Sequence, residues 1–553
     1  MRDRFYPVLE PDFKCCKPPF SFYHFIEQYW PGKEAKRTLH RIFSLMRKIN
    51  AQTVAVEDLA RKGELNSEAA AVEVRCGGTV EFKAYRFSFF DRPVTIDLLP
   101  YVPDADYLGY AIFIDMKLPD GTHSRYVYES VITEPSIHTD GSSPFGNALP
   151  SHYIHCLRRY SGWVAGNHFR LSGSFFSQQN GLTHVCAHAA LRWVLNNVPE
   201  RAEEIISYEN INKDLQIDHS KRKVGQYGND IQAIGLLMDD LLTVLDKHDY
   251  KYLDVNFEHP VGKPQPYWRF IYSIVESGYP VLVFFTARGS RHVICVIGHT
   301  FNSDIWDEEA KLAYSGAPRA EYLSTASWAD HFIIHDDNYG MYFSMATKAL
   351  SPTTRQGGPF QVTEALGIVP ADIELGPLEA EFLASIALRF LYEAPLKDCY
   401  WLNAIRQEEA TFGKWIVLRT LLTSKALYKQ HLCDIEDFEG NILKKSEIDT
   451  IVNKDVPEHF WITEVTLTDL YTANKRKIGE ILFNLSDPKI KQGDSPVTFT
   501  RKLFEACIAV RLPGNILIPE VVKKQISLMA RETDLIGHVQ ILRTRCPKPP
   551  FEW

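Results

Sequence analysis

The spacing of apolar and polar residues changes character along the chain and predicts several distinct regions. Residues 35–46 carry apolar side chains at helical spacing, so we expect a mostly helical lead-in over residues 1–60. The next stretch alternates short β-rich runs with Gly, Pro and Asp turns, which predicts a β-rich domain over residues 61–167. The runs that carry this prediction are residues 72–76, 80–85, 110–114 and 125–132.

A different order of elements marks the middle of the chain. Helical patterns come first, at residues 184–197, 229–247 and 266–277, and Gly278 ends the last of them. Short apolar strands follow, at residues 281–285, 292–297 and 332–335. Helices followed by antiparallel strands predict an α+β unit, which we place at residues 168–350.

The last third of the chain begins after a Pro- and Gly-rich stretch, residues 351–359, that predicts a linker. Strand-like and helical patterns then mix, so residues 360–553 are expected to form a mixed α/β domain. One predicted amphipathic helix places on a single face Leu378, Phe382, Ile386 and Phe390. The predicted fold class is therefore α+β, with a central domain of helices packed on an antiparallel sheet and a domain on either side of it.

Composition narrows the class of protein without naming a function. The chain has 553 residues, of which 45% are hydrophobic and 24% charged, as in ordinary folded proteins with about two to four domains. A net charge of -8 gives no overall attraction to nucleic acid, and we predict no nucleic-acid partner. No run approaches the roughly 18 apolar residues that cross a bilayer, so we expect a cytoplasmic protein without membrane insertion. The ten cysteines are dispersed and contain no CxxC motif, which argues against a disulfide framework.

One cysteine stands where a reactive thiol would be presented. Cys186 follows a polar loop at the point where an amphipathic helix begins, and if Thr183 caps that helix, Cys186 is its third residue. The unpaired N–H groups and the dipole at a helix start favour a thiolate, which is the nucleophilic form. Downstream, His292 begins a predicted strand and Asp336 ends the next one. A neighbouring antiparallel strand would bring the two together, with His292 as the base and Asp336 fixing its tautomer.

Several alternatives stay open at these positions. Asp337 competes with Asp336 as the carboxylate that orients the histidine, and His299 is a less favoured substitute for His292. His184 and His188 flank Cys186, but residues two apart on a helix face about 200° apart and cannot converge on one ion. We therefore predict no metal and no cofactor.

The order of these residues resembles the papain-like cysteine peptidase superfamily. The pattern of that superfamily is a polar loop with Gln, a Cys at a helix start, a His at a strand start and then a strand with Asp. Within it, the segments "HVICVIGH…IIHDD" look most like the bacteriocin-leader-peptidase (double-glycine) branch. The resemblance covers the central domain, residues 168–350, and implies a papain-like fold there. In that family a Gln shortly before the nucleophile donates to the oxyanion, which implies Gln179, with Gln178 and Asn180 as rivals. The usual offset of six residues falls on Asn180, whereas Gln179 lies seven before Cys186.

These residues predict a thiol-dependent hydrolase that cleaves a peptide or amide bond through an acyl-enzyme. The same groups serve a transglutaminase-like or other acyltransferase if an amine replaces water, and a degenerate papain-like fold would serve as an inactive scaffold in an interaction protein. The predicted partners are a protein or peptide substrate and, for the flanking domains, a regulatory protein.

Overall fold

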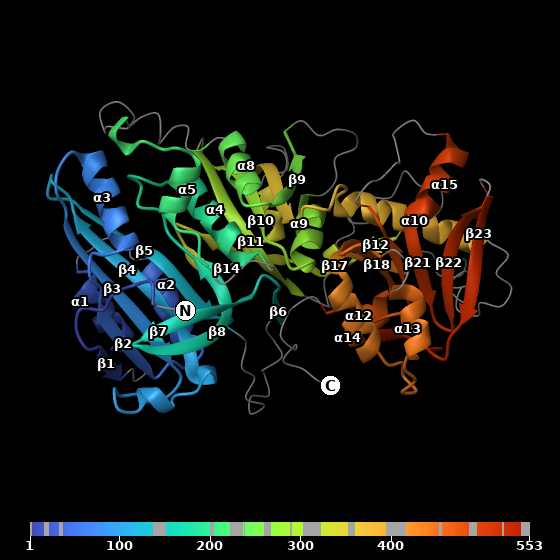
Figure 1. The fold of residues 1–553 in the computed structure, drawn as a ribbon, viewed down its shortest axis with the longest axis horizontal. Helices are drawn as coiled ribbons and strands as arrows, with labels where there is room; N and C mark the ends of the chain where they lie inside the picture. The colour runs from blue at the N-terminus through green and yellow to red at the C-terminus, as the bar shows by residue number, and fades with distance from the viewer. Residues whose placement is uncertain are drawn as a thin grey trace.

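The fold is that of a computed structural model. It describes residues 3–15, 21–31, 37–135, 151–198, 204–221, 236, 238–258, 267–287, 290–301, 322–351, 360–393, 416–452, 456–485, 495–522 and 525–543. Three antiparallel-rich sheets follow one another along the longest dimension of the molecule, in chain order (Figure 1). The chain is therefore mixed α and β, with mainly antiparallel sheets, as the sequence predicts. No helix in these ranges is both long and apolar enough to cross a membrane.

The N-terminal sheet has seven strands in the order β1-β2-β3-β4-β5-β8-β7, and every neighbouring pair is antiparallel. Its strands are β1 (Asp12–Cys15), β2 (Thr53–Asp58), β3 (Glu81–Phe90), β4 (Tyr107–Lys117), β5 (His123–Thr133), β7 (Arg158–Val164) and β8 (Asn167–Phe176). The helices of this region are α1 (Ser21–Tyr29), α2 (Arg37–Lys48) and α3 (Glu64–Cys76). The predicted helix at 35–46 and three of the four predicted strands are therefore confirmed.

The fourth predicted strand, at residues 72–76, is wrong, because these residues form the last turns of α3. The helix formers between Glu64 and Ala71 start the helix, and propagation through the valines costs less than starting a new element. Gly77 ends it in a left-handed conformation, with φ of 70°, and its N–H donates to the Glu73 carbonyl. The helix-forming residues at the start of α3 therefore determine the conformation of the β-branched residues at its end.

The central sheet follows the order β14-β13-β11-β10-β16-β15, with β6 also paired to β11 and β9 to β16. Its strands are β6 (Ser151–Ile154), β9 (Lys251–Asn256), β10 (Val281–Ala287), β11 (Ser290–Phe301), β13 (His331–Asp336), β14 (Gly340–Ala346), β15 (Leu350–Ser351) and β16 (Phe360–Val369). The helices that accompany it are α4 (Cys186–Asn197), α5 (Tyr208–Asp214), α8 (Met238–Lys247) and α9 (Tyr267–Glu276). The predicted strands lie within β10, β11 and β13, while part of the predicted helix at 229–247 lies outside the described residues.

The C-terminal sheet has the order β12-β17-β18-β20-β21-β22-β23. Its strands are β12 (Leu323–Ser324), β17 (Ile416–Ser424), β18 (His459–Leu467), β20 (Gly479–Phe483), β21 (Cys507–Leu512), β22 (Asn515–Val522) and β23 (Gln525–Glu532), beside the small pair β19 (Arg476–Lys477) and β24 (Val539–Gln540). The helices are α10 (Pro377–Glu393), α12 (Lys425–Asp434), α13 (Lys445–Val452), α14 (Thr468–Asn474) and α15 (Pro496–Ala506).

Helix α10 forms where predicted but buries a different face. Leu383 is 4% exposed and Ala380, Ala384, Ala387, Leu388 and Leu391 are fully buried, whereas Phe382 is 42% exposed. The helix carries apolar residues on both sides, and the buried side is rich in alanine, which lets it approach the core closely. The largest apolar residues were therefore a poor guide to the buried face.

The strands also cross the domain limits drawn from sequence. The predicted boundary at 167/168 falls at the start of β8, which belongs to the N-terminal sheet, and β6 and β16 belong to the central sheet. One hydrophobic core joins the N-terminal sheet, α4 and one face of the central sheet, and a second joins the other face to α9, α10 and the C-terminal sheet. Pairing partners far apart in sequence decide sheet membership, which local patterns do not reveal. Most of the predicted linker, residues 352–359, lies outside the described residues.

Candidate functional site

Cys186 is the first residue of α4 and is half-buried. The N-cap is Val185 and not Thr183, so the predicted cap is wrong and Cys186 stands at the first helical position. Thr183 is occupied elsewhere, because its hydroxyl accepts from the Asn180 side chain at 2.8 Å. The N–H of Cys186 belongs to the first turn of the helix, whose N–H groups have no partner within the helix.

His292 lies near the start of β11 and contacts both other members of the predicted triad. Its Nε2 lies 3.2 Å from Asp336 Oδ2, and the Cys186 side chain is near enough to the ring to raise the pKa of His292. Both neighbouring carboxylates face Nε2, so Nδ1 is the ring nitrogen left for the thiol. The side chain is 17% exposed and the Phe285 ring packs edge-on against it. Folding thus joins three residues that are 106 and 44 positions apart.

The two consecutive aspartates contact the histidine unequally. Asp336 Oδ2 is within hydrogen-bond distance of His292, while Asp336 Oδ1 accepts from the N–H groups of Asn338 and Tyr339 at 2.7 and 3.3 Å. Asp337 Oδ1 lies 3.5 Å from His292 Nε2, and no described residue hydrogen-bonds to its buried Oδ2. Asp336 therefore both closes the turn and faces the imidazole, which favours it as the orienting carboxylate.

The charges of this cluster shift two pKa values. Burial alone would lower the pKa of His292, but hydrogen bonds to Asp336 and Cys186 and the charges of both aspartates raise it to about 10. Burial raises the pKa of Asp337 to about 6, against the opposing effect of His292. His292 therefore remains an imidazolium at neutral pH, and a cation beside a thiol favours the thiolate.

Helix α2 of the N-terminal region supports the turn that carries the aspartates. The Thr38 hydroxyl donates to the Asp337 carbonyl at 3.4 Å, and Arg41 donates to the carbonyls of Met341 and Tyr342. Gly340 adopts φ of 105° and a Cβ there would lie 3.0 Å from Arg41, so the turn requires glycine at this close approach. The helical lead-in is thus part of the site's support.

The polar loop before Cys186 separates the three candidate oxyanion donors. The Gln178 side chain accepts from the Val127 N–H and donates to the Asp337 carbonyl, at 3.1 and 2.9 Å. Asn180 Oδ1 accepts from three successive N–H groups of residues 182–184, and its Nδ2 donates to Glu68 at 2.9 Å. Gln179 has no side-chain hydrogen bond to the described residues. The amide of Gln179 is therefore the one still available to a ligand.

A buried carboxylate anchors this loop. Glu68 of α3 accepts from Tyr126, Asn180 and His184 at 2.5, 2.9 and 2.8 Å. Burial alone would raise the pKa of Glu68, but His184 and the hydrogen bonds hold it below its usual value. His184 Nδ1 accepts from the Asn180 N–H at 3.1 Å, so His184 is a structural link. His188 Nδ1 likewise accepts from the Val185 N–H at 3.3 Å.

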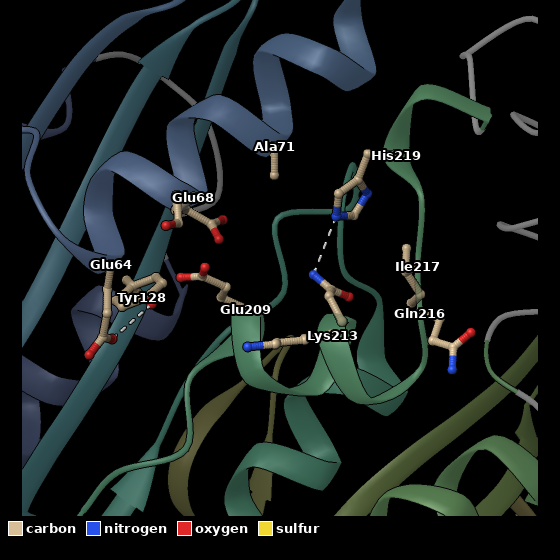
Figure 2. A pocket seen from close by; sticks show the side chains of 11 residues that line it. Glu64, Glu68, Ala71, Tyr128, Glu209, Lys213, Gln216, Ile217 and His219 are labelled. Carbon is tan, nitrogen blue, oxygen red and sulfur yellow. Dashed lines mark hydrogen bonds between the residues drawn. The ribbon is translucent and has the colours of Figure 1, made fainter.

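A cavity of about 400 Å³ lies between α3 and α5, and Glu68, which bonds to Asn180 of the loop, is also part of its wall. Figure 2 shows Glu64 and Glu68 on α3 and Glu209 and Lys213 on α5, with the carboxylates of Glu68 and Glu209 pointing toward one another. No local pattern in the sequence indicates this cavity, because its walls come from segments about 140 residues apart.

The comparisons with known proteins add no relative. No model of a protein family, no curated protein and no solved structure matches the chain. What the site can do is therefore argued from its own geometry.

Proposed function

We propose that the chain is a thiol-dependent hydrolase that cleaves a peptide or amide bond through an acyl-enzyme. The observation that carries this is the continuous contact from the Cys186 thiol through His292 to Asp336, with the thiol half-buried at a helix start. A nucleophile, a base and a group that orients the base are the parts that covalent acyl transfer needs.

In this reaction the Cys186 sulfur attacks the carbonyl carbon, and the carbonyl π electrons move to oxygen. The backbone N–H of Cys186 and the Gln179 amide donate to that oxyanion. His292 then gives its proton to the nitrogen of the leaving amine as the C–N bond breaks, which leaves a thioester. Water attacks the thioester as His292 takes a proton from the water, the C–S bond breaks, and the carboxylic acid leaves with the Cys186 thiolate and the His292 imidazolium restored.

The placement of these groups supports a papain-like organisation of the central domain. Helix α4 presents Cys186 against a sheet in which β10, β11 and β13 are antiparallel, and β11 and β13 supply the histidine and the aspartate. The proposal extends that domain into the N-terminal sheet, since β8 leads directly into the loop of Gln179.

The test is digestion of a proteome-derived peptide library by the full chain, followed by mass spectrometry of new termini. We expect new termini with the wild type, and none with Cys186→Ala. Cys433→Ala is the matched control because Cys433 is exposed and away from the described site. An activated ester offered in parallel should leave an acyl group on Cys186, which an added amine would intercept if the protein is an acyltransferase. Absence of both new termini and acylated Cys186 would contradict the proposal.

A further inference from the structure

Three side chains converge on one buried point at the end of the central sheet nearer the C-terminal domain. His155 follows β6, Glu276 ends α9 and His299 lies in β11. His299 Nε2 lies 2.7 Å from Glu276 Oε2 and 3.2 Å from His155 Nε2, and His155 Nε2 lies 3.1 Å from the same Glu276 oxygen. Each of the three side chains is about 5% exposed or less. Two imidazoles and a carboxylate thus share one small buried space.

This cluster is separate from the thiol site. His299 and His292 lie on the same strand, seven residues apart, which at about 3.3 Å per residue places their backbones roughly 23 Å apart. The sequence offered His299 as a substitute for His292, but it contacts neither Cys186 nor Asp336 among the contacts of the described residues. Its role must be sought in the cluster itself.

The ring nitrogens of the two histidines meet at one carboxylate oxygen. His299 Nδ1 lies 2.9 Å from the Thr300 carbonyl, which can only accept, so this contact needs a proton on Nδ1. His299 Nε2 faces a carboxylate oxygen and a second imidazole nitrogen. Either a shared proton or a metal ion joins atoms placed in this way, and the three ligand atoms lie close enough together to hold one ion.

The surroundings orient the three donors as metal ligands are oriented. The hydrogen bond from His299 Nδ1 to a backbone carbonyl fixes the tautomer that leaves Nε2 for a metal. Arg419 of β17 holds the other oxygen of Glu276 at 2.6 Å, and the charge of Arg419 is shared with Glu464, also at 2.6 Å. The Tyr153 ring stacks beside both imidazoles. His299 and Glu276 are thus each fixed by a hydrogen bond at their other polar atom, and His155 by ring stacking.

We propose that His155, Glu276 and His299 bind one Zn²⁺ ion that ties β6, α9 and β11 together. Tetrahedral zinc with bonds of about 2.0–2.1 Å sets its ligand atoms about 3.3 Å apart. Two of the separations here, 3.1 and 3.2 Å, are close to this value, and the third, 2.7 Å from His299 to Glu276, would widen when an ion binds. Two imidazoles and one carboxylate form a known zinc ligand set that leaves one coordination position for water. Through Arg419 the ion would also be linked to the C-terminal sheet.

A second buried cluster supplies the control, because its centre is already filled. His431, Glu464 and Glu480 also converge, but the Lys477 ammonium donates to all three, at 3.0 Å to His431 and 2.5 Å to Glu464. The Lys477 ammonium places a positive charge among the three side chains, as a metal ion would, so we expect no metal in this cluster. Loss of His431, which is half-buried, would test general effects of removing a histidine from a cluster of this kind.

The experiment measures metal in the full chain, purified without chelators, by inductively coupled plasma mass spectrometry. About one zinc per chain is expected in the wild type and in His431→Gln, falling about tenfold or more in His299→Gln and in His155→Gln. Because a variant can fail to fold, X-ray absorption at the zinc edge and the visible spectrum after Co²⁺ exchange are recorded on the wild type alone. Two imidazole ligands and an intense tetrahedral Co²⁺ band would support the site.

The proposal is overturned if the wild type holds less than about 0.1 zinc per chain and takes up none after dialysis against Zn²⁺. It is equally overturned if His155→Gln and His299→Gln retain the wild-type amount, because the metal would then lie elsewhere. Neither outcome depends on activity at Cys186, so the two proposals fail independently.

Discussion

The substitution Asp336→Asn tests which aspartate controls the imidazole. It keeps the size of the side chain but removes the negative charge that lies 3.2 Å from His292 Nε2. One opposite charge at such a distance shifts a pKa by about 1–3 units, so the pKa of His292 should fall from about 10 to about 7–9. At about 1.4 kcal/mol per unit, this is a loss of roughly 1.4–4 kcal/mol of stabilisation of the imidazolium.

The same shift has a consequence for stability. The pKa of His292 is raised on folding, so its stabilisation is complete below about pH 6.5, its usual pKa, and is lost as the pH rises through about 10. In Asp336→Asn the loss should be complete at a lower pH and be smaller in total. The contribution of His292 to the difference between the two unfolding curves should therefore be largest below the pKa of His292 in the variant and disappear above about pH 10.

The assay is nuclear magnetic resonance of ¹³C-labelled histidines across pH, with the His292 signal identified by its absence in His292→Ala. Asp337→Asn is the matched control, because Asp337 lies 3.5 Å from the ring and its own pKa is about 6. We expect a smaller fall in the pKa of His292 in this variant. An equal or larger fall in Asp337→Asn, or no change in Asp336→Asn, would refute the assignment.

Three further predictions concern the loop, a helix and a buried histidine. Gln179→Ala should lower kcat about 10²–10³-fold without changing the melting temperature. Gln178→Ala breaks two part-buried hydrogen bonds and should lower the melting temperature; the reverse pattern would exchange their roles. In α10, Leu383→Ala should lower the free energy of unfolding, measured with urea, by about 2–5 kcal/mol. Phe382→Ala should lower it distinctly less, since Phe382 is the exposed residue. Burial lowers the pKa of His335 to about 3. The free energy of unfolding should therefore fall by up to about 1.4 kcal/mol per pH unit between about pH 6.5 and pH 3, because the unfolded chain binds a proton that the folded chain does not. His335→Gln should remove this pH dependence from the acid unfolding curve.

The local patterns were sufficient where one segment decides its own structure. The strands that carry His292 and Asp336 were visible as apolar runs with a polar residue at one end, and α4 as an amphipathic helix after a polar loop. The order of these segments singled out Cys186. Contact between His292 and Asp336 requires the two strands that carry them to be neighbours, and β11 does pair with β13.

The parts that could not be predicted depend on residues far apart in sequence. Nothing local indicates that Thr38 of α2 donates to the Asp337 carbonyl, 299 positions away, or that Glu68 anchors Asn180. The resemblance implied Gln179 but left Gln178 and Asn180 as rivals, and only contacts with distant partners separate the three, because Gln178 and Asn180 are occupied by them. His155 and His299 are 144 positions apart, which left no spacing motif to read.

The most direct test of the central claim is the rate of alkylation of each thiol at several pH values, followed by peptide mass spectrometry. The account predicts that Cys186 is modified faster at pH 6 than the exposed Cys433, and that this advantage disappears in His292→Ala. The reason is that the imidazolium of His292, whose pKa is raised to about 10, is a cation at pH 6, and a neighbouring cation favours the reactive form of a thiol. Modification of Cys186 no faster than Cys433, or equally fast without His292, would contradict the account.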